Sequence, residues 1–208
     1  AHELVDRVTG VATAELSATS LGVAHRRAAR IVGPELAERL EAAAATFTSA
    51  IFDSRPGRID VLDDELASYL TVLRDSASTA RTAVETAPGD PKNASARAEA
   101  ATALGDVADT ASRILASFVP AIPDRTDVVW LEHIEDARSG TRAVVRVAPL
   151  SVSGLLRTRL FGHATAVLTS ATLTVGGNFD AMASAWGLTS DPGSDADVRW
   201  RGLDVGSP

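Results

Sequence analysis

Apolar residues recur at steps of three or four through most of the first 118 positions, which predicts a series of amphipathic helices. The clearest run extends from Asp60 to Ala87 and ends at Pro88-Gly89. Gly33-Pro34 and Asp90-Pro91 each place a proline at the first position of a following helix. The predicted helices cover residues 3–17, 21–32, 34–51, 60–87 and 91–118, with a loop at 54–58. Long helices joined by short Gly/Pro loops predict an antiparallel bundle.

The pattern changes after Pro120 and Pro123, and we place a domain boundary there. Alternating or continuous apolar residues then predict strands, separated by two short helices. The predicted strands cover residues 127–132, 141–147, 164–169 and 198–203, and the helices cover 152–161 and 178–186. Ser151 is positioned to cap the first of these helices. The predicted fold class is therefore mainly α with an α/β part.

Composition excludes several classes of protein. The chain of 208 residues has 45% hydrophobic residues, enough for one large or two small cores, and no apolar run long enough to cross a membrane. Residues Ala1 to Arg7 do not form a signal peptide, which suggests that the chain begins inside a longer protein. There is no cysteine, so thiolate ligands for zinc or an iron–sulfur cluster are absent from this piece. The net charge of −7 argues against a simple basic nucleic-acid-binding domain, although a local basic patch remains compatible with it.

The segment Ala166 to Thr174 reads as an apolar strand that runs into the hydroxyl residues of Ser170-Ala171-Thr172. In a motor domain such hydroxyls can hydrogen-bond a neighbouring ATPase loop and so transmit the nucleotide state. The alternative is a buried strand that ends in an ordinary Ser/Thr turn. These three small residues do not by themselves decide between the two interpretations.

The residues around this segment resemble motif III of the DinG/XPD-like DNA helicases. The similar stretches are Thr169–Leu173, Gly176–Phe179 and the following helix that ends in Gly187-Leu188, together with Ala148–Val152, Leu160-Phe161, Val129–Glu132 and Gly206–Pro208. Ala1-His2 resembles the last two residues of a DEAH box. The resemblance thus follows the chain in order, with the helical middle matching by pattern rather than by motif.

This resemblance implies an internal fragment with three parts. Residues 1–18 would end the first part of a RecA-like P-loop motor domain, residues 19–120 would be a helical Arch-like insertion, and residues 121–208 would return to the motor domain with motif III. Since both flanks would belong to one motor domain, we expect the two ends of the chain to pack together. The antiparallel long-helix insertion would lie between them.

The resemblance also implies a function. The parent would couple ATP hydrolysis, with Mg²⁺, to 5′-to-3′ unwinding of DNA in the bacterial cytoplasm, at the nucleoid. His2, Ser170 and Thr172 would be its catalytic and coupling residues in this piece. A P-loop needs a Gly-rich turn and a lysine, and the only lysine, Lys92, lacks that turn. The family's Mg²⁺-binding Asp and catalytic Glu would precede Ala1, so we expect the fragment alone to be inactive and to bind no cofactor.

The densest basic cluster consists of His25, Arg26, Arg27 and Arg30. In a helicase it could contact the phosphates of single-stranded or fork DNA, whereas the alternative is a solvated helix face. Trp130 and Trp186 lie in apolar contexts, which favours core packing over base stacking.

Two other classes of protein remain as alternatives. The first is a non-enzymatic helical domain that binds protein partners. The second is an α/β hydrolase with Ser170 as the nucleophile, which the absence of a Gly-x-Ser-x-Gly elbow disfavours. The sequence leaves open the oligomeric state, the preferred DNA structure, an iron–sulfur cluster upstream, and which Arch residues touch DNA.

Overall fold

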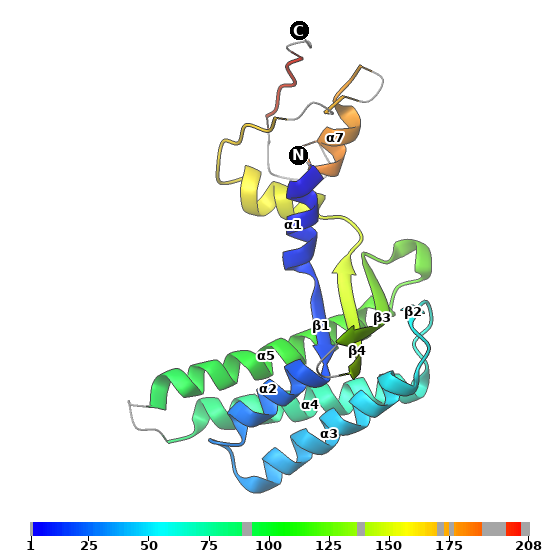
Figure 1. Ribbon diagram of the computed structural model, residues 1–208. Coiled ribbons are helices and arrows are strands. Elements are labelled where there is room, and N and C mark those ends of the chain that lie inside the picture. Colours follow the sequence, from blue (N-terminus) through cyan, green and yellow to red (C-terminus); the bar gives the residue numbers. More distant parts are fainter. Residues whose placement is uncertain are drawn as a thin grey trace. The chain divides into compact units, whose positions relative to one another are not determined.

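The computed structural model describes residues 2–88, 93–136, 140–169, 173–174, 177–188 and 199–204 (Figure 1). The chain divides into two compact units. One comprises Thr13–Ala148, and the other combines Ala1–Ala12 with Pro149–Pro208.

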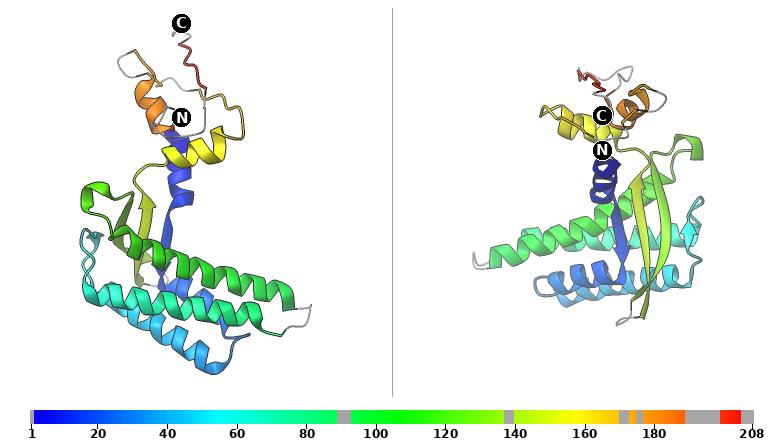
Figure 2. Two further views of the ribbon diagram at one scale, coloured as in Figure 1. Left: turned by 180° about the vertical axis from the view of Figure 1, so that it is seen from behind. Right: turned by 45° about the horizontal axis from the view of Figure 1, so that its top comes forward.

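Four helices form the body of the Thr13–Ala148 unit. They are α2 (Ala18–Ala28), α3 (Pro34–Asp53), α4 (Asp64–Thr86) and α5 (Ala94–Ser117). Helices α2 and α4 each pack against both α3 and α5, and successive helices run in opposite directions (Figures 1 and 2). The predicted antiparallel bundle is confirmed. The chain is mainly α with an α/β part, as its composition of elements predicts.

Local capping sets where these helices begin. Pro34 opens α3 directly after Gly33, as predicted. The Asp63 carboxylate accepts a hydrogen bond from the Leu66 backbone N–H at 2.7 Å, so α4 begins at Asp64 rather than at Asp60. The predicted cap Asp90-Pro91 lies outside the described residues, and α5 is described from Ala94.

The core of this unit is built from one stripe of each helix. Its buried helical residues are Leu21, Ala24, Ala28, Leu40, Ala43, Phe47, Ile51, Leu70, Leu73, Ala77, Ala80, Val84, Ala100, Leu104, Val107, Ala108, Ala111 and Ile114. Many of them are alanines, and small side chains allow neighbouring helix axes to approach closely. The periodicity in the sequence thus identified the buried faces.

A four-stranded antiparallel sheet completes the unit, in the order β1-β4-β3-β2. Its strands are β1 (Ala14–Ser17), β2 (Gly57–Arg58), β3 (Asp127–Asp136) and β4 (Gly140–Pro149). Strands β3 and β4 confirm the two predicted strands and extend beyond them. Strand β2 occupies part of the predicted 54–58 loop and pairs with Leu131 and Trp130.

The prediction of a helix through Ser17 is wrong at its end. Helix α1 stops at Ala12, and Ala14–Ser17 form β1, which pairs with Val147 to Val144 of β4. Leu16 fits a helical stripe equally well, but here it lies in a strand, where both Leu16 and Ser17 are buried. Pairing with a segment about 130 residues away overrides the local pattern.

The sheet belongs to the same core as the helices. Leu16, Val129, Leu131, Ala143, Val145 and Val147 alternate along three strands and join the helical cluster. Arg113 of α5 donates to Asp127 of β3 at 2.6 Å, which adds an ion pair between the layers. The compact unit therefore runs from Thr13 to Ala148, and its limits differ from the predicted insertion of residues 19–120.

The second unit contains α1 (His2–Ala12), α6 (Ser153–Leu155), η3 (a π-helix, Leu156–Phe161) and α7 (Asp180–Ala185). Its buried centre is Val152, Leu156, Met182 and Trp186, against which Leu4, Val5 and Val8 of α1 pack. The expectation that the two ends of the chain pack together is confirmed for residues 1–12 and 149–208. Trp186 is a core residue, as predicted.

The predicted strand at Ala164–Thr169 is wrong. These residues have no regular secondary structure, and the side chain of Val167 is 86% exposed. A strand needs a neighbour for its backbone N–H and C=O groups, and the described part of this unit contains no other strand. The described residues of the predicted strand 198–203 are not a strand either.

Candidate nucleic-acid interface

The four basic residues predicted to bind DNA lie together near the end of α2. His25, Arg26 and Arg27 are in its last turn, and Arg30 follows directly after the helix. His25 is half-buried, whereas the three arginines are exposed. Because cations at the carboxyl end of a helix also stabilise its dipole, position alone does not separate a binding role from a structural one.

The local sequence explains why these side chains face outward. Ser17 and Ser20 form a reciprocal capping box, in which Ser17 Oγ accepts from Ser20 N–H and Ser20 Oγ accepts from Ser17 N–H. This cap sets the start of α2. Leu21, Ala24 and Ala28 then face the core, and the arginines occupy the remaining positions of the helix surface.

The cations of the cluster are not equivalent. Arg27 donates to the Glu99 carbonyl oxygen of α5 at 3.5 Å and lies 3.7 Å from the Glu99 carboxylate. Within the described residues no ion pair is found for Arg26 or Arg30. The Arg26 guanidinium lies over Gly22, where an added Cβ would be 3.1 Å from Nη1. Arg26 and Arg30 are therefore the cations most available to an anion.

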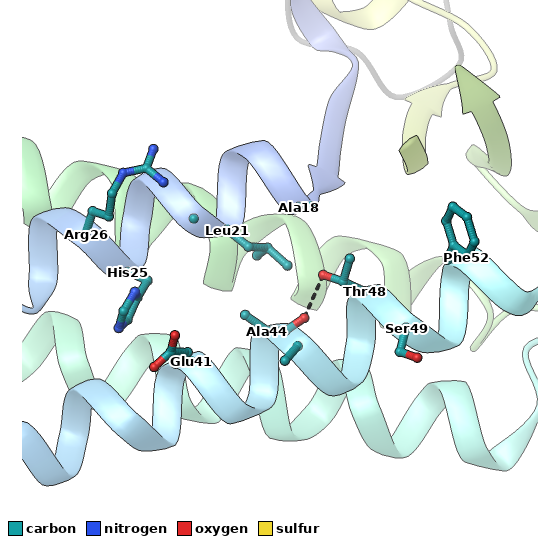
Figure 3. Close-up of a pocket in the computed structure, with 11 residues that line it drawn as sticks. Ala18, Leu21, His25, Arg26, Glu41, Ala44, Thr48, Ser49 and Phe52 are labelled. Atoms are coloured by element: carbon teal, nitrogen blue, oxygen red, sulfur yellow. Dashed lines mark hydrogen bonds between the residues drawn. The ribbon is translucent and has the colours of Figure 1, made fainter. Parts of the chain in front are cut away.

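A groove runs between α2 and α3 beside this cluster (Figure 3). Many of its lining residues are small; the lining consists of Ala18, Leu21, Gly22, His25, Arg26, Glu41, Ala44, Ala45, Thr48, Ser49 and Phe52. His25 of α2 and Glu41 of α3 face each other across it (Figure 3). The groove thus carries both signs of charge at one end.

Phe52, at the other end of the groove, is an aromatic surface that the sequence analysis did not identify. Its side chain is 50% exposed, and its ring stacks on His133 of β3 with 5.9 Å between centroids. Phe52 is the last apolar residue before α3 ends at Asp53, and only the tertiary structure places β3 beside it. An exposed ring of this kind can stack on a base or bury against a partner.

A second groove, between the end of α3 and the start of α4, is acidic. Asp53, Asp63 and Glu65 line it together with Tyr69. The Tyr69 hydroxyl donates to the Glu65 carboxylate, and this hydrogen bond raises the pKa of the Tyr69 phenol. Such a surface repels phosphate. The basic residues His25, Arg26, Arg27 and Arg30, hereafter the α2 cluster, are therefore the better candidate for binding an anion.

The predicted catalytic side chains lie outside the part of the chain that the structure describes. His2 begins α1, but its side chain lies outside the described residues. Ser170 and Thr172 also lie outside them. Their roles stay predictions.

The neighbouring Gly187-Leu188, noted in the sequence, has a structural role. The Leu188 N–H donates to Ala183 and the Gly187 N–H to Ser184, which together end α7 in a Schellman motif. Gly187 has a φ of +71°, and its carbonyl accepts from buried Arg157 Nε at 2.7 Å. The Gly-Leu pair therefore closes α7 onto the helix that contains Arg157.

Two kinds of feature are absent from the described residues. No group of three or more His, Asp or Glu side chains is arranged to hold a metal ion there. Across the same residues, no helix combines the length and apolar character that a membrane crossing requires.

Comparison with known proteins identifies close relatives. No protein-family model matches the chain. The proteins called "ATP-dependent helicase DinG" in Mycobacterium tuberculosis (strain ATCC 25618 / H37Rv) and in Mycobacterium bovis are each 64% identical to it over 208 residues. This alignment covers 100% of the chain and 30% of each relative. Along its entire length the chain is therefore similar to proteins of the DinG helicase family, and it spans 30% of the length of those relatives.

Proposed function

We propose that the chain is an internal segment of an ATP-dependent DNA helicase of the DinG/XPD type, from the end of a DEAH box to just past motif III. The observation that carries the proposal is the 64% identity over the whole chain with proteins named as ATP-dependent helicases. The whole protein would act on DNA in the cytoplasm, at the nucleoid, and would move 5′-to-3′ on a single strand.

The Thr13–Ala148 unit would be the Arch-like insertion. Its first strand, β1, and its last strand, β4, are paired neighbours, with Ala14 opposite Val147. The chain therefore enters and leaves this unit at adjacent positions, as an insertion into another domain requires. Residues 1–12 and 149–208, which share one compact unit, would belong to the motor domain.

ATP and Mg²⁺ would be bound elsewhere in the whole protein. The chain has no Gly-rich phosphate loop, and its single lysine, Lys92, is not in one. It also has no cysteine for an iron–sulfur cluster. His2 would couple the γ-phosphate site to neighbouring motifs, and the chain by itself would not hydrolyse ATP.

Ser170 and Thr172 would transmit the nucleotide state to the DNA groove. In the whole protein, Ser170→Ala with Thr172→Ala should lower the unwinding rate more than the ATPase rate. A hydrogen bond contributes about 0.5–1.5 kcal/mol, so the loss of coupling should be about 1–3 kcal/mol in total. Both rates are measured on one preparation with an unchanged melting temperature. A proportional fall in both rates would assign the hydroxyls to catalysis instead, and no change in either would leave them as an ordinary turn.

The α2 cluster would contact the phosphates of a single DNA strand. Replacing Arg26 and Arg30 by glutamine should weaken binding of a fluorescently labelled oligothymidine to the chain. Each lost phosphate contact should reduce the slope of log K against log salt by about 0.7. Fluorescence anisotropy across a salt series measures both quantities.

The matched control replaces two arginines that are already engaged in the bundle unit. Arg113 pairs with Asp127, and Arg74 pairs with Asp75. Arg113→Gln with Arg74→Gln removes the same charge from the same unit and should leave most of the affinity intact. Equal losses in the two double variants would mean that net charge alone governs binding, and the cluster would not be the interface.

A helical domain that binds a protein partner remains the second candidate. The small-residue groove between α2 and α3 and the half-exposed Phe52 favour it. The same titration discriminates between the two, since a partner-binding domain has no salt-dependent affinity for oligothymidine.

A further inference from the structure

Arg27 is the one member of the α2 cluster that already contacts an acidic residue, in the part of the chain that the structure describes. Its guanidinium faces two oxygens of Glu99 on α5, the backbone carbonyl at 3.5 Å and a carboxylate oxygen at 3.7 Å. The second carboxylate oxygen accepts from Ser95 Oγ at 3.4 Å. Glu99 thus meets the Arg27 guanidinium with one neutral backbone oxygen and one charged carboxylate oxygen, and only the second carries the charge that a phosphate oxygen would replace.

This contact is weak enough to be exchanged. Both distances are long for a charged hydrogen bond, and the two side chains are 43% and 58% exposed. An ion pair in such a setting contributes little to stability, because water and salt compete for both partners. The core contacts of Leu21, Ala24 and Ala28, rather than Arg27, hold α2 in the bundle. Arg27 can therefore leave Glu99 without loss of the fold.

We propose that Glu99 is an internal competitor for phosphate that limits the anion affinity of the α2 cluster by occupying Arg27. The proposal rests on the proposed DNA-binding role of this cluster. In the free protein, Arg26 and Arg30 can bind a phosphate directly. Arg27 must first give up its contact with Glu99 before it can bind a phosphate oxygen. Glu99 thereby weakens binding to nucleic acid and keeps the exposed cluster from binding anions at low concentration.

The test is Glu99→Gln in the full chain, which removes the charge and keeps the size of the side chain. Titration with labelled oligothymidine at low salt should give a Kd about two- to fivefold lower than that of the wild type. Because Arg27 would then contribute an additional phosphate contact, the slope of log K against log salt should steepen by about 0.7.

Glu85→Gln is the matched control. Glu85 pairs with Arg81 on α4 at 2.8 Å, with exposures of 44% for Arg81 and 49% for Glu85. The control removes the same charge and releases an arginine of similar exposure outside the α2 cluster. It should change the Kd less than Glu99→Gln does. In an Arg27→Gln background, Glu99→Gln should have no more effect than Glu85→Gln.

Two patterns of gain would overturn the inference. One is an equal gain from Glu99→Gln and Glu85→Gln, which would show an effect of net charge only. The other is a full gain from Glu99→Gln when Arg27 is absent. The variant with Arg26→Gln and Arg30→Gln separates failure of this inference about Glu99 from failure of the proposed DNA-binding function. If that variant binds like the wild type, the cluster is not the interface; if it binds weakly while Glu99→Gln has no effect, only the role of Glu99 is wrong.

Discussion

Replacing Phe47 by alanine should lower the free energy of unfolding of the bundle unit by about 3–5 kcal/mol. Phe47 is fully buried in α3, and it has the largest side chain among the fully buried residues that the structure describes. Its removal would leave a cavity that rigid neighbouring helices fill only in part. Urea denaturation followed by far-ultraviolet circular dichroism measures the change, because this unit contains the three longest helices of the described structure.

Phe52→Ala on the same helix is the internal control. Phe52 is half-exposed and loses mainly its stacking on His133, so the expected cost is about 1–2 kcal/mol. Equal losses at the two positions would contradict the assignment of Phe47 to the core. Hydrogen exchange of α3 and α4 should report the Phe47 effect separately from changes in the other unit.

Gly187→Ala should destabilise the unit formed by residues 1–12 and 149–208 by about 2–5 kcal/mol. Two costs add at this position. A side chain at a φ of +71° is strained, and a Cβ would overlap the Ser153 carbonyl oxygen. Because that oxygen is backbone, it cannot turn aside, and α6 would have to shift. Hydrogen exchange of the Leu188 amide, which closes α7, is the measurement.

Gly177→Ala separates the two costs. Gly177 has a φ of +83°, and a Cβ there would have no neighbour within 4 Å among the described residues. We therefore expect only the conformational cost of about 1–2 kcal/mol. If Gly187→Ala lowers the free energy of unfolding no more than Gly177→Ala does, the close approach to Ser153 does not contribute to the destabilisation. The Arg157 Nε–H donates to the Gly187 carbonyl. Its protection from hydrogen exchange, like that of the Leu188 amide, should fall only in the Gly187 variant.

The sequence alone predicted the bundle, because the residues that define a helix and its buried face lie close together in the chain. Leu66, Leu73, Ala77, Ala80 and Val84 recur at helical spacing along α4, so their periodicity shows which face meets the core. Proline and glycine then mark the helix ends without reference to any neighbour. The basic cluster on α2 was also visible from the sequence, since its residues are adjacent in the chain.

Strands depended on partners that the local pattern does not specify. Ala14–Ser17 continued an apparent helix, yet β4 provides an antiparallel partner and they form β1. Ala164–Thr169 looked like a buried strand, yet in this chain Val167 is 86% exposed and the segment is irregular. Backbone hydrogen bonds within a helix close over four residues, whereas those of a strand must come from elsewhere in the protein.

The same distinction applies to the candidate site. The sequence identified His25, Arg26, Arg27 and Arg30 as a group of like charges, but it treated them as equivalent. Only the packing of α2 on α5 brings Glu99 to Arg27, 72 positions along the chain, and leaves Arg26 and Arg30 without such a contact in the described structure. The sequence shows which residues are charged, whereas the tertiary fold decides which of these charges lie beside an opposite charge.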